Sequence, residues 1–138
     1  MGREEVNFVS GFHLKCARQA VASGDFSKAR YEYRRSVNVL KNNNVSDPAL
    51  FAEYEEFVKR DPYFEKLANV FIAGIRDNPG IMQSDIFLMD ITKDWGEKYG
   101  LGKSVEPIDK KYFFDFAEKL GYITTQSDGK DKRIFVVG

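Results

Sequence analysis

An apolar pattern with the period of an α-helix constrains this chain more than any other feature of its sequence. Apolar side chains recur three or four residues apart at Phe64, Leu67, Ala68, Phe71, Ile72 and Ile75. Asp61-Pro62 is a suitable start for this helix, and Asn78-Pro79-Gly80 must end it, because proline disfavours helical geometry in the preceding residue. We therefore place a domain boundary before the helix, which divides the chain into residues 1–62 and residues 63–138.

Two further helices and a pair of strands are predicted after this break. One helix starts near Gln83-Ser84-Asp85 and could extend to Tyr99, and its apolar residues, most of them expected to face the core, are Ile86, Phe87, Met89 and Ile91. The next begins near Pro107 and ends at Gly121, and its expected buried face consists of Ile108, Tyr112, Phe113, Phe116, Ala117 and Leu120. Residues 122–125 and 133–137 then predict two strands joined by a polar turn, and Ile81 is a candidate for a third, short strand.

The segments Asn78–Ile86 and Phe113–Ile123 resemble the winged helix-turn-helix superfamily. In that superfamily the third helix commonly ends in a Leu-Gly-x-Ile type sequence before the wing, and this chain has Leu120-Gly121-Tyr122-Ile123 at that place. The resemblance covers roughly the last half of the chain. It implies a winged helix with a two- or three-stranded wing. For the whole chain we expect a mainly α, α+β fold in which an N-terminal helical hairpin and a connecting helix pack on this winged helix.

The resemblance also implies a function. In DNA-binding members the third helix enters the major groove and the wing touches the backbone. We therefore expect a non-catalytic nucleic-acid-binding protein, DNA-binding or transcription-related, that acts as a homodimer because one such module makes few phosphate contacts. The positions that would face the nucleic acid are Ser84, Lys110, Lys111, Phe114, Lys130, Lys132 and Arg133.

The charge pattern leaves a second function open. Asp109, Asp115 and Glu118 share the third helix with its lysines, and residues 79–138 contain nine Lys or Arg against ten Asp or Glu. Winged helices also serve as protein docking modules, so the fold alone does not decide the ligand. The alternative is an adaptor that binds protein partners through the winged helix and the N-terminal helices.

The N-terminal segment predicts a helical hairpin followed by a connecting helix. Helix-favouring residues extend from Glu4 to Ala22 and again from Phe26 to Lys41, with the break at Ser23-Gly24-Asp25. The segment Gly24–Ala29 with Tyr33 resembles the turn and second helix of a single tetratricopeptide repeat. The connecting helix extends from Pro48 to Arg60.

Phe8, Phe12, Cys16 and Ala20 are spaced four residues apart and form one apolar stripe along the first helix. A lone hairpin exposes one apolar face. We expect the connecting helix, the C-terminal domain or a second copy of the protein to cover the hairpin.

A basic and aromatic surface is predicted on the second helix of the hairpin and the connecting helix. Arg30, Arg34 and Arg35 give one side of the second helix a positive charge, while Tyr31 and Tyr54 fall on otherwise polar faces, where an aromatic side chain is more often an interface anchor. These five residues are the candidate partner-binding set. The alternative is a solvated face that Glu32 and the acidic connecting helix neutralise.

Composition argues against catalysis, cofactor or metal binding and a membrane location. The 21 Lys and Arg residues balance the 21 Asp and Glu residues, so no global field attracts nucleic acid or an anionic membrane. His13 and Cys16 are the sole His and Cys, too few for a metal site, and Gly102-Lys103-Ser104 lacks the first glycine of a phosphate-binding loop. No apolar stretch has the length of a membrane span. We expect a soluble, cytoplasmic protein that is not an enzyme and uses no cofactor.

Overall fold

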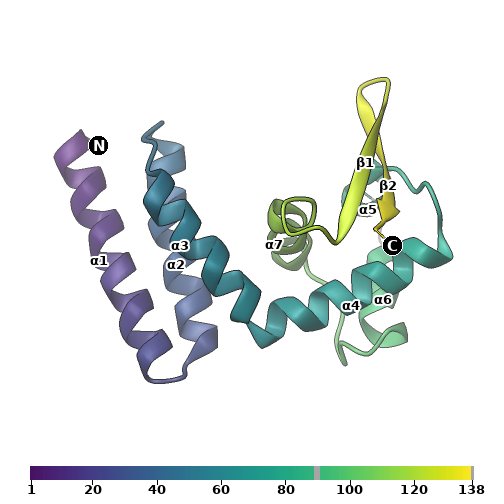
Figure 1. Cartoon of the computed structure of the whole chain (residues 1–138), viewed down its shortest axis with the longest axis horizontal. Helices are drawn as coiled ribbons and strands as arrows, with labels where there is room; N and C mark the ends of the chain where they lie inside the picture. The colour runs from purple at the N-terminus through teal and green to yellow at the C-terminus, as the bar shows by residue number, and fades with distance from the viewer. Residues whose placement is uncertain (89–90, 138) are drawn as a thin grey trace. The chain divides into compact units, whose positions relative to one another are not determined.

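The computed structural model describes residues 1–88 and 91–137, without the side chain of Ile91. The described residues form seven helices and one two-stranded antiparallel sheet (Figure 1), namely α1 (Arg3–Ala22), α2 (Phe26–Asn42), α3 (Pro48–Arg60), α4 (Pro62–Asp77), α5 (Gln83–Leu88), α6 (Ile91–Lys98), α7 (Pro107–Ala117), β1 (Ile123–Asp128) and β2 (Asp131–Val136). The predicted mainly helical α+β class is confirmed at this level. The chain forms two compact units, Met1–Pro62 and Tyr63–Gly138. The expected inward direction of Met89 and Ile91 concerns side chains outside the described residues.

The N-terminal unit contains α1, α2 and α3, and local capping explains where each helix begins and ends. Gly24 follows α1 with a φ of +77°, and the amide of Asp25 donates to the carbonyl of Ala20 at 2.9 Å. This is the left-handed stop that glycine adopts without strain. The Asp25 side chain caps α2 by accepting a hydrogen bond from the amide of Lys28 at 3.0 Å, and Asp47 caps α3 in the same way. The predicted hairpin and connecting helix are confirmed.

Mostly small side chains make the buried face of α1, and of the four residues in the predicted stripe this face includes Ala20 but not Phe8, Phe12 or Cys16. This face consists of Val6, Ser10, Ala17 and Ala20, and the Ser10 hydroxyl donates to the carbonyl of Ser36 on α2 at 3.1 Å. Small residues allow two helix backbones to approach closely, so the bulky rings fall on the opposite side of α1. Phe8 is 75% exposed and Phe12 is 57% exposed.

A hydrogen-bonded network links the three helices of the N-terminal unit. The guanidinium of Arg18 on α1 donates twice to the carboxylate of Glu53 on α3, at 2.7 and 3.0 Å. The hydroxyl of Tyr33 on α2 donates to the same carboxylate at 2.7 Å. The hydrogen bond from Arg18 is the largest cause that lowers the pKa of Glu53 below its ordinary value of 4.5, and burial is the largest cause that raises the pKa of Tyr33.

This network should make the N-terminal unit sensitive to acid. A carboxyl whose pKa is lowered by folding stabilises the folded state above its ordinary pKa, and that contribution is lost as the pH falls through the lower, folded value. We expect Glu53→Gln to flatten the acid side of the stability profile, measured as the urea midpoint at a series of pH values below 4.5. Arg18→Ala should flatten it as well, since Arg18 is the main cause of the shift. An unchanged acid slope in both variants would contradict this assignment.

An aromatic core holds the C-terminal unit together. The predicted inner face of α4 is confirmed except at Ile72, which is half-buried, because Phe64, Leu67, Phe71 and Ile75 are all at most 1% exposed. Phe71 stacks on Phe113 of α7 at a ring distance of 4.7 Å, and Phe64 also stacks on Phe113, at 5.9 Å. Close packing of large rings removes much apolar area from water and fixes α7 against α4.

The β1–β2 hairpin leaves α7 through a left-handed stop, as predicted. Gly121 has a φ of +84°, and the amide of Tyr122 donates to the carbonyl of Ala117 at 2.8 Å. The strands are longer than predicted, because pairing continues to Asp128 opposite Asp131 and leaves a turn of only two residues.

The segment before α5 is joined to the hairpin. The amide of Ile134 in β2 donates to the carbonyl of Ile81 at 3.0 Å, and an isolated antiparallel bridge pairs Met82 with Arg133. The predicted short pairing at Ile81 is therefore present, and it places the start of α5 beside the turn of the hairpin.

Candidate functional site

The first turn of α7 is rotated relative to the prediction. Ile108, predicted to be buried, is 46% exposed, whereas Asp109 and Lys110, predicted to face outward, are 4% and 7% exposed. The cause is Asp109, whose side chain accepts from the amide of Glu106 at 3.1 Å in a capping box and from the hydroxyl of Tyr63 at 2.8 Å. This rotation buries Lys110. The prediction that Lys110 contacts nucleic acid is therefore wrong.

Two other candidates on α7 already have partners within the unit. The ammonium of Lys111 lies 3.2 Å from the carboxylate of Asp115, one turn further along the helix. Phe114 is half-buried, with its ring 5.5 Å from that of Phe71 and 5.2 Å from that of Phe87. Phe114 therefore extends the aromatic core toward α5 and does not stand out on a free surface.

Arg133 holds the hairpin to the segment before α5. Its Nε donates to the Asp128 carboxylate across the strands at 2.7 Å, and its Nη1 donates to the carbonyl of Gly80 at 3.1 Å. Both bonds fix the direction of the guanidinium, so this residue positions the hairpin.

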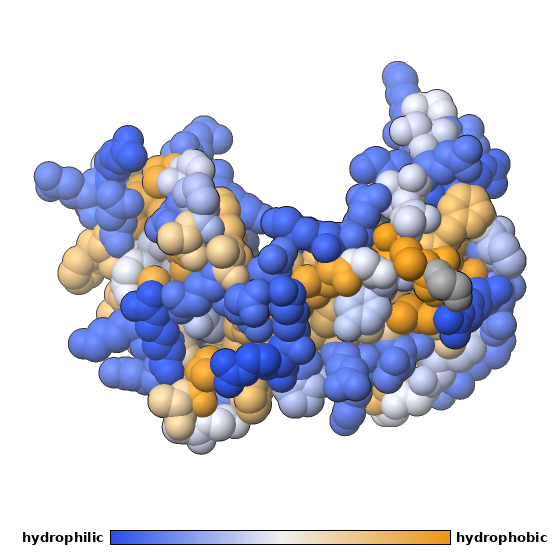
Figure 2. Space-filling model, viewed as in Figure 1, coloured by the Kyte–Doolittle hydropathy of each residue, from blue (hydrophilic) through white to orange (hydrophobic). Residues whose placement is uncertain are grey.

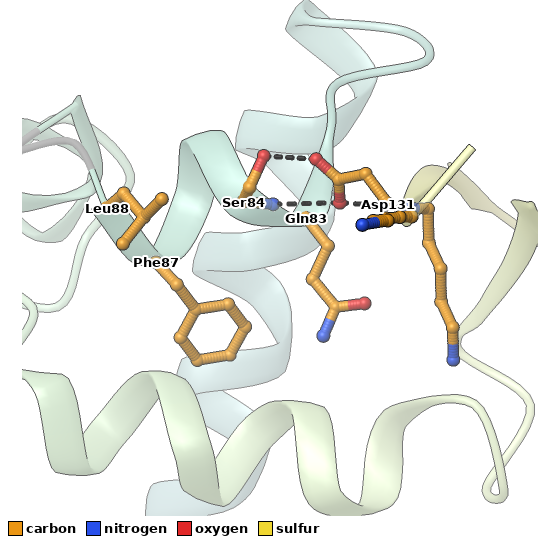
Figure 3. Close-up of a pocket in the computed structure, with 7 residues that line it drawn as sticks. Gln83, Ser84, Phe87, Leu88 and Asp131 are labelled. Atoms are coloured by element: carbon orange, nitrogen blue, oxygen red, sulfur yellow. Dashed lines mark hydrogen bonds between the residues drawn. The ribbon is translucent and has the colours of Figure 1, made fainter. Parts of the chain in front are cut away.

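A groove of about 380 Å³ opens between α5 and the hairpin turn (Figure 3), and its walls are Gln83, Ser84, Phe87, Leu88, Lys130, Asp131 and Lys132. Ser84 and Asp131 form its base. The Ser84 hydroxyl and amide both donate to the Asp131 carboxylate, and the amide of Lys132 donates to it at 2.7 Å. The hydroxyl bond is the largest cause that lowers the pKa of Asp131, so the carboxylate stays charged and occupied by these donors.

The remaining groove side chains are directed outward and combine apolar with positive character. Leu88 is 83% exposed and Phe87 is partly exposed, while the Lys130 and Lys132 side chains reach solvent at the turn. Within residues 1–88 and 91–137, no carboxylate forms an ion pair with either lysine. Gln83 and Phe87 point to the same side of α5 (Figure 3).

The groove unites three of the seven predicted nucleic-acid positions, Ser84, Lys130 and Lys132. It also contains Phe87 and Leu88, which the sequence analysis did not assign to a site. The sequence did not indicate them, because Ile86 and Phe87 are both strongly apolar and either could take the inward position on this helix. Ile86 takes that place and is fully buried, which leaves the next two side chains outside.

The predicted partner-binding set of the N-terminal unit is only partly exposed. Tyr54 is buried and stacks on Tyr33 at 5.7 Å, so its assignment as an interface anchor is wrong. Arg30 is largely buried and donates twice to Asp61, at 2.6 and 2.8 Å, which makes it a structural ion pair.

The other three members of the predicted set lie nearer the surface. Arg35 lies over the exposed ring of Tyr31 at 5.8 Å, and Arg34 is half-buried. The two exposed members, Tyr31 and Arg35, therefore contact each other.

No group of three His, Cys, Asp or Glu side chains in the described ranges is arranged to hold a metal ion. His13 Nδ1 instead lies 2.6 Å from the Glu32 carboxylate. None of the described helices combines the length and the apolar character that crossing a membrane requires.

Comparisons of the chain with known protein families, with curated proteins and with solved structures found no match.

Proposed function

We propose that the C-terminal unit is a non-catalytic docking module of the winged-helix type, and that its groove binds an acidic and apolar segment of a partner protein. The observation that carries this proposal is the juxtaposition of two exposed apolar side chains, Phe87 and Leu88, with two exposed lysines, Lys130 and Lys132, around one opening. An apolar side chain as exposed as Leu88 gains free energy when a partner covers it.

The groove chemistry selects the partner segment. A leucine- or phenylalanine-sized side chain would pack against Phe87 and Leu88, and a neighbouring carboxylate would reach Lys130 or Lys132. Apolar anchors provide most of the affinity in such an interface, whereas rim charges mainly improve the association rate and the choice of partner. The Ser84–Asp131 contact fixes the base of the groove, so little ordering is needed when a ligand binds.

Nucleic acid is the second candidate, and the position of Lys130 and Lys132 at the tip of the hairpin is what favours it. A wing would touch the phosphate backbone with such residues. Of the five basic residues predicted for this role, Lys110 is buried, and Lys111 and Arg133 are paired with Asp115 and Asp128. Two phosphate contacts give a slope of log affinity against log salt of only about −1.8, which is weak support for a DNA-binding surface.

We expect Leu88→Ala to weaken binding of acidic, leucine-containing peptides about tenfold or more, because the substitution removes an apolar anchor without disturbing the core. Lys130→Ala combined with Lys132→Ala should weaken binding less and remove most of its salt dependence. The measurement is peptide titration of isotope-labelled protein by NMR, with the groove amides as the reporter. Ile108→Ala is the matched control, since Ile108 is an exposed apolar residue on α7 that does not line the groove.

The same titration with a random DNA duplex at low salt separates the two candidates. Groove signals that move with DNA and not with peptides, and that lose their salt dependence in the double lysine variant, would replace the protein partner with nucleic acid. Unmoved groove signals with both ligands would remove this groove from function.

A further inference from the structure

One face of α1 is exposed from its first turn to its last, and it has two aromatic rings between one negative and one positive side chain. Its residues recur three or four apart, so they form one stripe on the helix, and all are exposed: Glu5, Phe8, Phe12, Lys15 and Gln19. Apolar side chains interrupt the otherwise hydrophilic surface of this unit (Figure 2). Exposed rings at Phe8 and Phe12, adjacent on one stripe, mark an interaction surface.

No element of the N-terminal unit covers this stripe. The buried residues of α1, including Ser10 and Ala17, lie on the opposite side of the helix, and Ser10 meets α2 there. The contact with α3 uses Arg18, which is not one of the stripe residues. The hairpin and α3 therefore complete their own packing without Phe8 or Phe12.

We propose that a second copy of this chain covers the stripe, with the two α1 helices antiparallel about a two-fold axis. Glu5 lies three residues before Phe8, and Lys15 lies three residues after Phe12. An antiparallel pairing that stacks Phe8 on Phe12 of the second copy must therefore also bring Glu5 to Lys15 of the second copy. The two-fold axis repeats both contacts, so one stripe supplies both halves of a self-complementary interface.

The charges also exclude the parallel arrangement. A parallel pair would set Glu5 against Glu5 and Lys15 against Lys15 of the second copy, and like charges that face each other are destabilising. Only the antiparallel pair matches opposite charges at both ends of the aromatic contact.

Gly11 gives an independent reason to expect close helix pairing here. It lies in the middle of α1, is exposed, and a methyl group at its Cα would meet no atom within 4 Å. Glycine inside a helix costs roughly 1 kcal/mol relative to alanine, and no contact within the chain requires it at this position. A neighbouring helix packed on the stripe would use the open space that Gly11 leaves beside Phe8 and Phe12.

The oligomeric state of the full-length protein tests the proposal. Sedimentation velocity over a range of concentrations should show a monomer–dimer equilibrium. Phe8→Ala combined with Phe12→Ala should raise the dimer dissociation constant about thirtyfold or more, as truncation of central aromatic anchors does. Ile108→Ala, which removes an exposed apolar side chain from α7 of the C-terminal unit, is the matched control and should leave the constant unchanged. Circular dichroism should show that every variant retains its helices.

Charge reversal then tests the register itself. Glu5→Lys alone and Lys15→Glu alone should each weaken the dimer, because each creates two like-charge contacts. A mixture of the two variants should form a heterodimer more readily than either forms a homodimer, because both contacts again pair opposite charges. Lys28→Glu, on α2, is the control for a change in net charge. A monomer at every concentration, a dimer insensitive to the Phe8 and Phe12 changes, or a mixture without preference for the heterodimer would overturn the proposal.

Discussion

Gly96→Ala is expected to lower the free energy of unfolding of the C-terminal unit by about 3 kcal/mol or more, the upper range for overpacking a core. Gly96 is buried in α6, and a methyl group at its Cα would lie 1.9 Å from the carbonyl oxygen of Lys103. The obstacle is backbone, so no side-chain rotation relieves it. The segment after α6 is also tied to this place, because the amide of Leu101 donates to the Gly96 carbonyl at 2.7 Å.

Hydrogen–deuterium exchange of the amides in α4 and α7 measures this loss within the unit. A change of this size should accelerate their exchange roughly a hundredfold. Gly11→Ala is the matched control, because Gly11 is also helical but has open space at its Cα. That control should not accelerate exchange in α4, and equal exchange in wild-type protein and the Gly96 variant would contradict the predicted clash.

Arg30→Ala should destabilise the N-terminal unit by about 3–5 kcal/mol, because it leaves the carboxylate of Asp61 buried without its main partner. The side chain of Asp61 is completely buried, and Arg30 supplies two hydrogen bonds to it. The urea midpoint and the exchange of α2 amides provide the measurement. Arg35→Ala, which removes an exposed arginine from the same helix, should cost less than about 1 kcal/mol.

The pair can also be removed as a whole. Arg30→Met combined with Asp61→Leu should recover part of the lost stability, because the double variant removes both charges of the buried pair together. If the double variant were as unstable as Arg30→Ala, the loss would come from packing and not from an uncompensated charge.

Features that depend on neighbouring residues were predictable from the sequence. The caps at Asp25 and Asp47 and the stop at Gly121 each use residues a few positions away, and local chemistry determines them. The inner face of α4 was predictable because many apolar residues repeat the same period, so no single exception changes the result.

Features that depend on distant partners were not predictable in this way. The first turn of α7 is rotated because Asp109 serves both its own cap and the hydroxyl of Tyr63, 46 residues earlier. Arg30 is removed from the surface by Asp61, 31 residues later. In each case a charged residue is buried because a specific partner satisfies it, and hydrophobic periodicity contains no information about that partner.

The candidate groove was missed for a related reason. Lys130 and Lys132 were predicted as site residues from their place in the hairpin turn, but the apolar half of the groove depends on which side chains α5 leaves outside. Ile86 and Phe87 are equally suitable for burial by composition. The pairing of Ile81 and Met82 with β2 sets the direction of α5, and that direction buries Ile86.

The distribution of rare side chains gives each unit its own natural optical or chemical reporter. Trp95, the single tryptophan, is buried in the C-terminal unit in edge contact with Phe71, and Cys16, the single cysteine, lies half-buried on α1 of the N-terminal unit. Tryptophan emission therefore follows the melting of one unit, while the rate at which a thiol reagent labels Cys16 follows the opening of the other. Whether the two units unfold together can be determined on the unmodified chain, without a single substitution.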